Sequence, residues 1–133
     1  MNELNLEIPS LSENIRIVES FIDNAKEEYS ISDDMYGNIM VAVTESVNNA
    51  IIHGNGGDST KNVILKLQLG KKELRFIIKD EGIGFNYDNL SDPTSPENIK
   101  KIGGRGIFLM RHLCEEVIFT NKGATIELVF TID

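Results

Sequence analysis

The sequence predicts an α+β fold: a two-layer sandwich in which a mostly antiparallel, mixed sheet carries about three helices on one face. Two kinds of apolar pattern predict it. Several short runs alternate apolar and polar residues, as half-buried strands do, and other runs repeat apolar residues at helical spacing. The expected order is strand, two helices, two strands, a long loop, a short helix and two strands. That order favours one sheet with its helices on one face.

The first strand is expected around Leu4, Leu6 and Ile8, which alternate with polar residues until Pro9 ends the run. Ser10 and Glu13 then form a capping-box pattern, in which the serine oxygen accepts a hydrogen bond from a free N–H at the start of a helix. The helix itself is predicted by apolar residues at helical spacing, namely Ile15, Val18, Phe21, Ile22, Ala25 and Tyr29.

A second helix is expected to begin near Ser32 and Asp33 and to end at the glycine-rich residues 54–58. Its apolar stripe consists of Tyr36, Ile39, Met40, Val43, Val47, Ala50 and Ile51. Two alternating runs follow, joined by Gly70-Lys71-Lys72, and they predict a hairpin.

Residues 82–104 are rich in glycine and proline and poor in apolar side chains. A segment of this kind is typical of a functional lid or a disordered loop, and we expect a lid at about 85–103. A short helix from Gly106 to about Cys114 comes next. Two strands, 117–121 and 125–132, are expected to close the chain around a turn at Lys122-Gly123.

Composition limits the class of protein. At 133 residues, with 41% hydrophobic and 26% charged residues, the chain is expected to be a single domain, 1–133. Its formal charge of −8 argues against direct nucleic-acid binding. No apolar run approaches the roughly 20 residues that span a bilayer, and the N-terminus lacks the pattern of a signal peptide. A lone cysteine, Cys114, fits a reducing compartment, so we expect a cytoplasmic protein without membrane contact.

Glu45, Asn49 and His53 follow one another at intervals of four residues, which places them on one helix face, apart from the apolar stripe. Polar residues opposite a core stripe are usually only solvated. However, a carboxylate and a carboxamide one turn apart can converge on a hard cation such as Mg²⁺, which takes one or two protein oxygens and fills its other positions with phosphate and water.

Asp80 continues the apolar series Leu74, Phe76 and Ile78, so its carboxylate is expected on the apolar face at the end of a strand. Such a carboxylate is costly unless it is hydrogen-bonded or paired. An adenine amino group is one suitable donor, and a buried arginine or a backbone N–H is the structural alternative. Gly82 and Gly84 follow at once and permit a flat ligand or another backbone to approach closely.

Gly103-Gly104-Arg105-Gly106 precedes the short helix and lies in a stretch, 100–111, that holds four basic residues and no acid. Backbone N–H groups at a helix N-terminus attract anions, and arginine can donate two hydrogen bonds to a phosphate. A helix entry made of permissive residues is the alternative. The segment is neither a Walker A loop nor a dinucleotide fingerprint.

Four segments in order resemble the four boxes of the GHKL, or Bergerat-fold, ATPases, and the match runs from about residue 4 to the C-terminus. They are Glu45-Ser-Val-Asn-Asn49-Ala-Ile-Ile-His53-Gly54, Asp80-Glu-Gly82-Ile-Gly84, Gly104-Arg-Gly106 and Gly123-Ala-Thr125. Within that superfamily the chain looks most like the anti-sigma factor serine/threonine kinases of bacterial sporulation and stress responses. The compact length, the opening strand and helix, and the first box carry this closer resemblance.

The resemblance implies a role for each box. Asn49 would hold Mg²⁺, Glu45 would act catalytically on the phosphoryl acceptor, and His53 would belong to the nucleotide-binding set. Asp80 would bind the adenine amino group, and Gly82 and Gly84 would shape the base pocket. Two further groups complete the nucleotide-binding set: Gly104, Arg105 and Gly106 at the phosphates, and Thr125 near the adenine. The third box reads Gly-Ala-Thr where the family often has Gly-Thr-Thr. Asn48 stands beside Asn49, and the family spacing Glu-x-x-x-Asn selects Asn49.

The implied function is an ATP- and Mg²⁺-dependent kinase that binds a sigma factor and phosphorylates a serine or threonine of a small anti-sigma factor antagonist. ADP would be the product. The family often forms homodimers, so the resemblance also allows a homodimer. Three alternatives remain: a nucleotide-binding regulatory module without transfer, a stand-alone histidine-kinase-type catalytic domain, and an interaction domain without nucleotide. The sequence shows no phospho-acceptor helix hairpin of the kind found in histidine kinases, and this argues against the second alternative.

Overall fold

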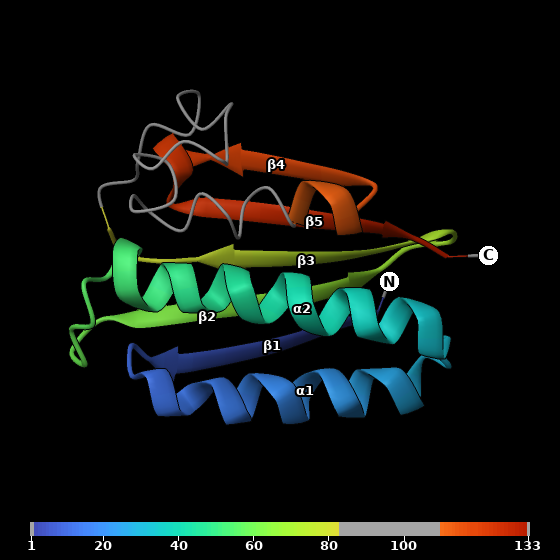
Figure 1. The fold of residues 1–133 in the computed structure, drawn as a ribbon, viewed down its shortest axis with the longest axis horizontal. Coiled ribbons are helices and arrows are strands. Elements are labelled where there is room, and N and C mark those ends of the chain that lie inside the picture. Colours follow the sequence, from blue (N-terminus) through green and yellow to red (C-terminus); the bar gives the residue numbers. More distant parts are fainter. Residues whose placement is uncertain (1, 83–109, 133) are drawn as a thin grey trace.

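The computed structural model describes residues 2–82 and 110–132, which form a β-sheet with helices on one of its faces (Figure 1). The strands are β1 (Asn2–Pro9), β2 (Asn62–Leu69), β3 (Glu73–Lys79), β4 (Glu116–Thr120) and β5 (Thr125–Thr131). The long helices are α1 (Ile15–Glu28) and α2 (Asp33–Asn49). A helical turn at 110–113 lies on the same face of the sheet as α1 and α2. The predicted two-layer α+β arrangement is therefore present.

The strands form one sheet in the order β1-β2-β3-β5-β4, and every pairing between these strands is antiparallel. The prediction of a mixed sheet is wrong for the described strands. β4 runs parallel to β3, but β5 lies between them and pairs antiparallel with both. The hairpin β4–β5 thus folds its second strand inward and leaves its first strand at the edge.

The helix-facing side of the sheet holds the core. Matching register places Leu67, Phe76 and Leu128 in one row across three strands, and all three side chains are buried. The rings of Phe76 and Phe130 meet edge to face with centroids 5.9 Å apart, a favourable geometry for aromatic pairs. The sequence alternation therefore marks the buried face of the sheet correctly.

The helices bury the stripes that their spacing predicts. α1 buries Val18, Ile22 and Ala25, and the buried positions of α2 include Ile39 and Val47. Ser32 caps α2, because its hydroxyl accepts a hydrogen bond from the Met35 N–H at 3.2 Å. Acidic residues follow in the first turn, where the helix dipole favours negative charge.

The capping box predicted at Ser10 and Glu13 does not form. A 3₁₀ turn, Ser12–Asn14, precedes α1, and Ser10 is buried beneath it with 1% of its surface exposed. The Ser10 hydroxyl donates to the carbonyl of Lys61 at 2.7 Å. A long-range backbone acceptor therefore takes the place of the local partner that the sequence suggests.

Beyond Asn49 the helix widens into a π-helical turn, Ala50–Gly54. Its backbone bonds span five residues, as in the bond from the Asn55 N–H to the Ala50 carbonyl at 2.8 Å. Such turns are rare in proteins, and many of those that occur lie at functional sites. This turn brings Gly54 against the residues that follow β3, at the end of the sandwich where α2 finishes.

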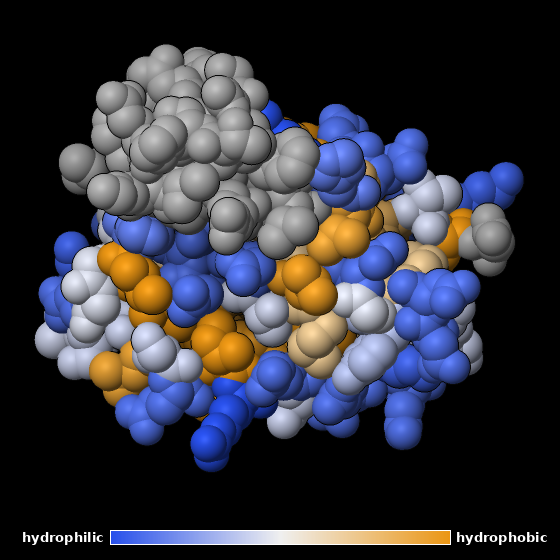
Figure 2. All heavy atoms as spheres, in the orientation of Figure 1, coloured by the Kyte–Doolittle hydropathy of each residue, from blue (hydrophilic) through white to orange (hydrophobic). Residues whose placement is uncertain are grey.

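The helix face also exposes apolar side chains among the polar ones (Figure 2). The exposed large apolar residues are Leu11, Ile17, Val41 and Ile52. None of the helices in residues 2–82 and 110–132 combines the length and apolar character that crossing a membrane requires.

Candidate functional site

Asp80 directly follows β3 and is anchored by its backbone. Its N–H donates to the carbonyl of Ala124 at 2.9 Å, which extends the β3–β5 ladder by one bond. Its side chain turns toward the end of α2, because a Cβ atom placed on Gly54 would lie 2.2 Å from Asp80 Oδ2. The carboxylate therefore lies on the helix side of the sheet, as the alternation Leu74, Phe76, Ile78 predicts.

Two glycines make this approach of chain segments feasible. A Cβ on Gly54 would overlap the Asp80 carboxylate, and a Cβ on Gly82 would lie 2.0 Å from the carbonyl oxygen of Gly54. Real Cβ atoms do not come so close to other heavy atoms. The backbone of Gly82 therefore meets the backbone of Gly54, and neither glycine has room for a side chain of its own.

The Asp80 carboxylate is half-buried and only partly satisfied by the described residues. Its Oδ1 accepts a hydrogen bond from the Gly82 N–H at 2.7 Å, and within residues 2–82 and 110–132 no ion pair with it is found. Burial raises the pKa of Asp80, and the Gly82 N–H opposes this in part. A backbone N–H thus holds Oδ1, and within the part of the chain that the structure describes Oδ2 has no hydrogen-bond donor.

Glu45 and Asn49 lie one turn apart at the end of α2, and both are half-buried. Two hard oxygen donors at this spacing suit a cation such as Mg²⁺. Next to Glu45, Ser46 is buried, and its hydroxyl lies within hydrogen-bond reach of two acceptors, the Ala42 carbonyl and the Met110 sulfur. Met110 therefore packs against α2 next to Glu45.

His53 does not simply extend that stripe. The face shared by residues four apart exists in an α-helix, whereas His53 lies in the π-helical turn and is exposed. The structure thus brings together Glu45 with Asn49, and Gly54 with Asp80 and Gly82, but it leaves His53 outside these contacts.

Thr125 is the first residue of β5 and pairs with Lys79. Strand alternation places it on the sheet face opposite that of Ile126 and Ile78, and its hydroxyl accepts a hydrogen bond from Asn121 at 3.0 Å. The residue bonded to the Asp80 backbone is instead Ala124. The register therefore separates the Thr125 side chain from the face that carries Asp80.

Several predicted features lie outside the described residues: the lid at about 85–103, Gly84, Gly104, Arg105 and Gly106. Cys114 lies within them and is buried. Its burial raises the pKa of the thiol to about 12, so the sulfur stays protonated at neutral pH and serves in packing.

Asn55 is a residue that the sequence did not single out, because it lies in the glycine-rich segment 54–58 that was expected only to end the second helix. Asn55 is only 3% exposed, and its side chain bonds to Ser10, Asn62 and the backbone of Glu81. An asparagine between glycines is typical of a turn, so nothing local signals its burial. Only the packing of three distant segments around it makes it a junction.

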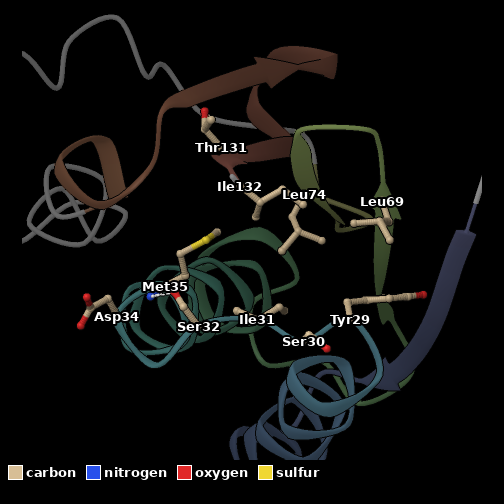
Figure 3. A pocket seen from close by; sticks show the side chains of 10 residues that line it. All are labelled: Tyr29, Ser30, Ile31, Ser32, Asp34, Met35, Leu69, Leu74, Thr131 and Ile132. Atoms are coloured by element: carbon tan, nitrogen blue, oxygen red, sulfur yellow. Dashed lines mark hydrogen bonds between the residues drawn. The ribbon is translucent and has the colours of Figure 1, made fainter.

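A cavity of about 390 Å³ opens at the other end of the sandwich, between the α1–α2 connection and the β2–β3 hairpin (Figure 3). Leu74 and Ile132 point into it from the sheet, and Asp34 turns its carboxylate away. It is lined by Tyr29, Ser30, Ile31, Ser32, Asp34, Met35, Leu69, Leu74, Thr131 and Ile132. Among the described residues that line it, no charged group points into the cavity, so the Asp80 end is the stronger candidate for chemistry.

Comparison with known proteins points to one family. The model of the histidine kinase-like ATPase domain matches residues 8–130. An anti-sigma F factor of Bacillus thuringiensis (strain Al Hakam) is 32% identical over 134 residues, covering 96% of this chain and 90% of its own. One of Shouchella clausii (strain KSM-K16) is 31% identical over 119 residues, covering 87% and 81%.

Among solved structures, the RsbU and RsbW domains of a Mycobacterium tuberculosis protein are similar, with a TM-score of 0.63 at 14% identity. The match covers 99% of this chain but only 32% of that larger one. At such identity the likeness speaks for the fold alone. It confirms the predicted fold class.

Proposed function

The chain belongs to the histidine kinase-like ATPase family, and from this premise we propose that it is an ATP- and Mg²⁺-dependent serine/threonine protein kinase. Membership in an ATPase domain family implies ATP binding. The finer proposal is transfer of the γ-phosphoryl group to a hydroxyl of a small antagonist protein. The curated relatives named anti-sigma F factors support this direction, and by the same likeness we propose that the chain binds a sigma factor.

The observation that carries the proposal is the half-buried Asp80 carboxylate, held by Gly82 at one oxygen and pressed against Gly54. A fold keeps such a carboxylate at a cost in desolvation. In our proposal Asp80 Oδ2 accepts a hydrogen bond from the 6-amino group of adenine, and Gly82 and Gly84 belong to the base pocket by resemblance.

The phosphoryl end of the site would lie along α2. Asn49 would hold Mg²⁺ through its amide oxygen, and Mg²⁺ when bound supplies neutralisation of phosphate charge. Glu45, one turn earlier, would orient or accept the proton of the attacking hydroxyl. Phosphoryl transfer depends mostly on positioning and charge stabilisation, so the protein needs few reacting groups of its own. Gly104, Arg105 and Gly106 are proposed phosphate contacts, and His53 and Thr125 keep their proposed places in the nucleotide-binding set by resemblance alone.

The wider biology is proposed from the relatives. A sigma factor and an antagonist would be protein partners in the cytoplasm, and a homodimer is the proposed assembly. The chain's charge of −8 disfavours direct contact with nucleic acid.

Transfer of label tests the proposal. The purified chain is incubated with γ-labelled ATP, Mg²⁺ and the proteins encoded beside its gene, with Asp80→Asn as the matched control. We expect an acid-stable label on one small partner, and much less with the control. Acid-labile label would indicate a histidine kinase, and ATP binding without transfer a regulatory module. Absence of nucleotide binding would overturn the proposal altogether.

A further inference from the structure

Asn55 joins three segments of the chain through both ends of its amide. Its Nδ2 donates to the Ser10 hydroxyl at 2.7 Å and to the Asn62 carbonyl at 3.0 Å. Its Oδ1 accepts from the N–H of Glu81 at 2.7 Å. The side chain thereby ties the end of β1 and the start of β2 to the turn that follows β3.

Two successive backbone amides in that turn have different acceptors. The Glu81 N–H goes to Asn55 Oδ1, and the Gly82 N–H goes to Asp80 Oδ1. Consecutive N–H groups of a turn tend to converge on one anion. Because Asn55 takes the first of them, the Asp80 carboxylate receives the second, and among the described residues Oδ1 is the oxygen that it bonds.

The network around Asn55 is well suited to fix this geometry. Asn55 is 3% and Ser10 1% exposed, and every buried side-chain polar atom within the described residues has a partner. Asn62 reinforces the junction, because its N–H donates to the carboxylate of Glu81. A satisfied buried network of this kind holds one arrangement and resists slippage of its members.

We propose that Asn55 is a positioning residue for base recognition: by holding the Glu81 amide, it orients Asp80 so that the site prefers a purine that carries a 6-amino group. This inference rests on the proposed function, since it assumes that adenine binds at Asp80. Asn55 itself touches neither the base nor the phosphates in this scheme. Its effect is therefore a change in selectivity for the base, with no direct contribution to phosphate binding.

The test compares two nucleotides that differ in one donor. Calorimetry measures the affinities for ATP and for purine riboside triphosphate, which lacks the 6-amino group, with wild type, Asn55→Ala and Ser10→Ala. A hydrogen bond to a charged group corresponds to roughly ten- to a hundredfold in affinity, and we expect a preference of that size in wild type. We expect Asn55→Ala to reduce the preference at least fivefold, since Asp80 is then free to bond both amides.

Ser10→Ala is the matched control, because it damages the same buried network but leaves the bond between Asn55 and Glu81 intact. It should lower thermal stability and keep the preference for ATP. A second readout uses the chain without nucleotide: the Glu81 amide should exchange its hydrogen faster in Asn55→Ala than in Ser10→Ala. If Asn55→Ala does not fold, Asn55→Ser takes its place, because the serine side chain is too short to reach Glu81.

The outcomes separate the two levels of the argument. A wild-type chain that binds both nucleotides equally, or neither, refutes adenine recognition by Asp80 and this inference with it. A preference that survives Asn55→Ala while the Glu81 amide is released refutes only the positioning role. An equal loss of preference in Ser10→Ala would make the effect one of general stability and would also overturn the proposal.

Discussion

The folded structure partly buries the Asp80 carboxylate, so its charged form carries a desolvation cost. Burial raises its pKa above the ordinary value of 3.8, so between 3.8 and the raised pKa the folded chain binds more protons than the unfolded chain. The free energy of unfolding therefore falls as the pH rises through this range. At neutral pH the full cost is present, and it is the kind of cost that functional carboxylates impose.

Asp80→Asn should remove that cost and weaken the site. We expect a higher midpoint of thermal unfolding at pH 7 without nucleotide, and a gain that shrinks as the pH falls toward 3.8. ATP affinity should drop about ten- to a hundredfold, the worth of one hydrogen bond to a charged group. Unfolding curves at several pH values and a calorimetric titration check both effects. Lower stability at every pH, with ATP affinity unchanged, would make Asp80 a structural carboxylate.

Substitution of Glu45 distinguishes a kinase from a protein that only binds nucleotide. If Glu45 acts on the acceptor hydroxyl, its interaction matters chiefly in the transition state, so Glu45→Ala should reduce transfer while ATP affinity hardly changes. General-base contributions are about 10²–10⁴-fold, and we expect the lower part of this range because a loose transition state needs little early proton removal. Phosphorylation of the antagonist and nucleotide titration are measured on one preparation. Parallel loss of both would reassign Glu45 to the metal site.

Individual residues differ in how far the sequence predicts them. Asp80 stands out because it is a charged residue at the next position of an apolar alternation, and its orientation follows from that pattern. Ser10 misleads, because a local capping pattern competes with the Lys61 carbonyl, which lies close only in the folded chain. Asn55 gives no signal at all, since its burial depends on the packing of three segments.

At the scale of elements, the π-helical turn can contact the segment after β3 because Gly54 and Gly82 have no side chains. Gly82→Ala would place a Cβ 2.0 Å from a backbone oxygen that cannot move alone. We expect a loss of about 1–3 kcal/mol in the free energy of unfolding, as for overpacking elsewhere, together with weaker ATP binding. Denaturant unfolding measures the first effect and calorimetry the second.

Gly37 provides the matched control, because it lies in α2 and a Cβ there meets nothing within 4 Å. Gly37→Ala should stabilise the chain by up to about 1 kcal/mol, the helix propensity difference, and leave ATP affinity unchanged. Equal effects of the two substitutions would contradict the close-packed junction.

Helices and strands follow from periodicity, whereas their ends and their order do not. The hairpin at Gly70 and the start of α2 near Ser32 are predicted from local patterns and are present. The π-helical turn at Ala50–Gly54 is invisible to a helical pattern, because it depends on how α2 meets the segment after β3. The central place of β5 likewise reflects long-range pairing.

At the scale of the whole molecule, the sandwich has two unlike ends. One end gathers Gly54, Asp80 and Gly82 beside the last turn of α2. The other end opens into the mostly apolar cavity around Leu74 and Ile132. We propose that the nucleotide binds at the first end, and a ligand that binds only the folded chain stabilises the segments that hold it.

Amide hydrogen exchange with and without ATP and Mg²⁺ tests this assignment most directly. We expect slower exchange at residues 49–57 and 79–82, because a bound nucleotide opposes the local opening of the segments that hold it. Exchange at residues 29–35 and 69–74, around the cavity at the other end, should change little. Protection confined to the cavity residues, or no protection anywhere, would contradict the account.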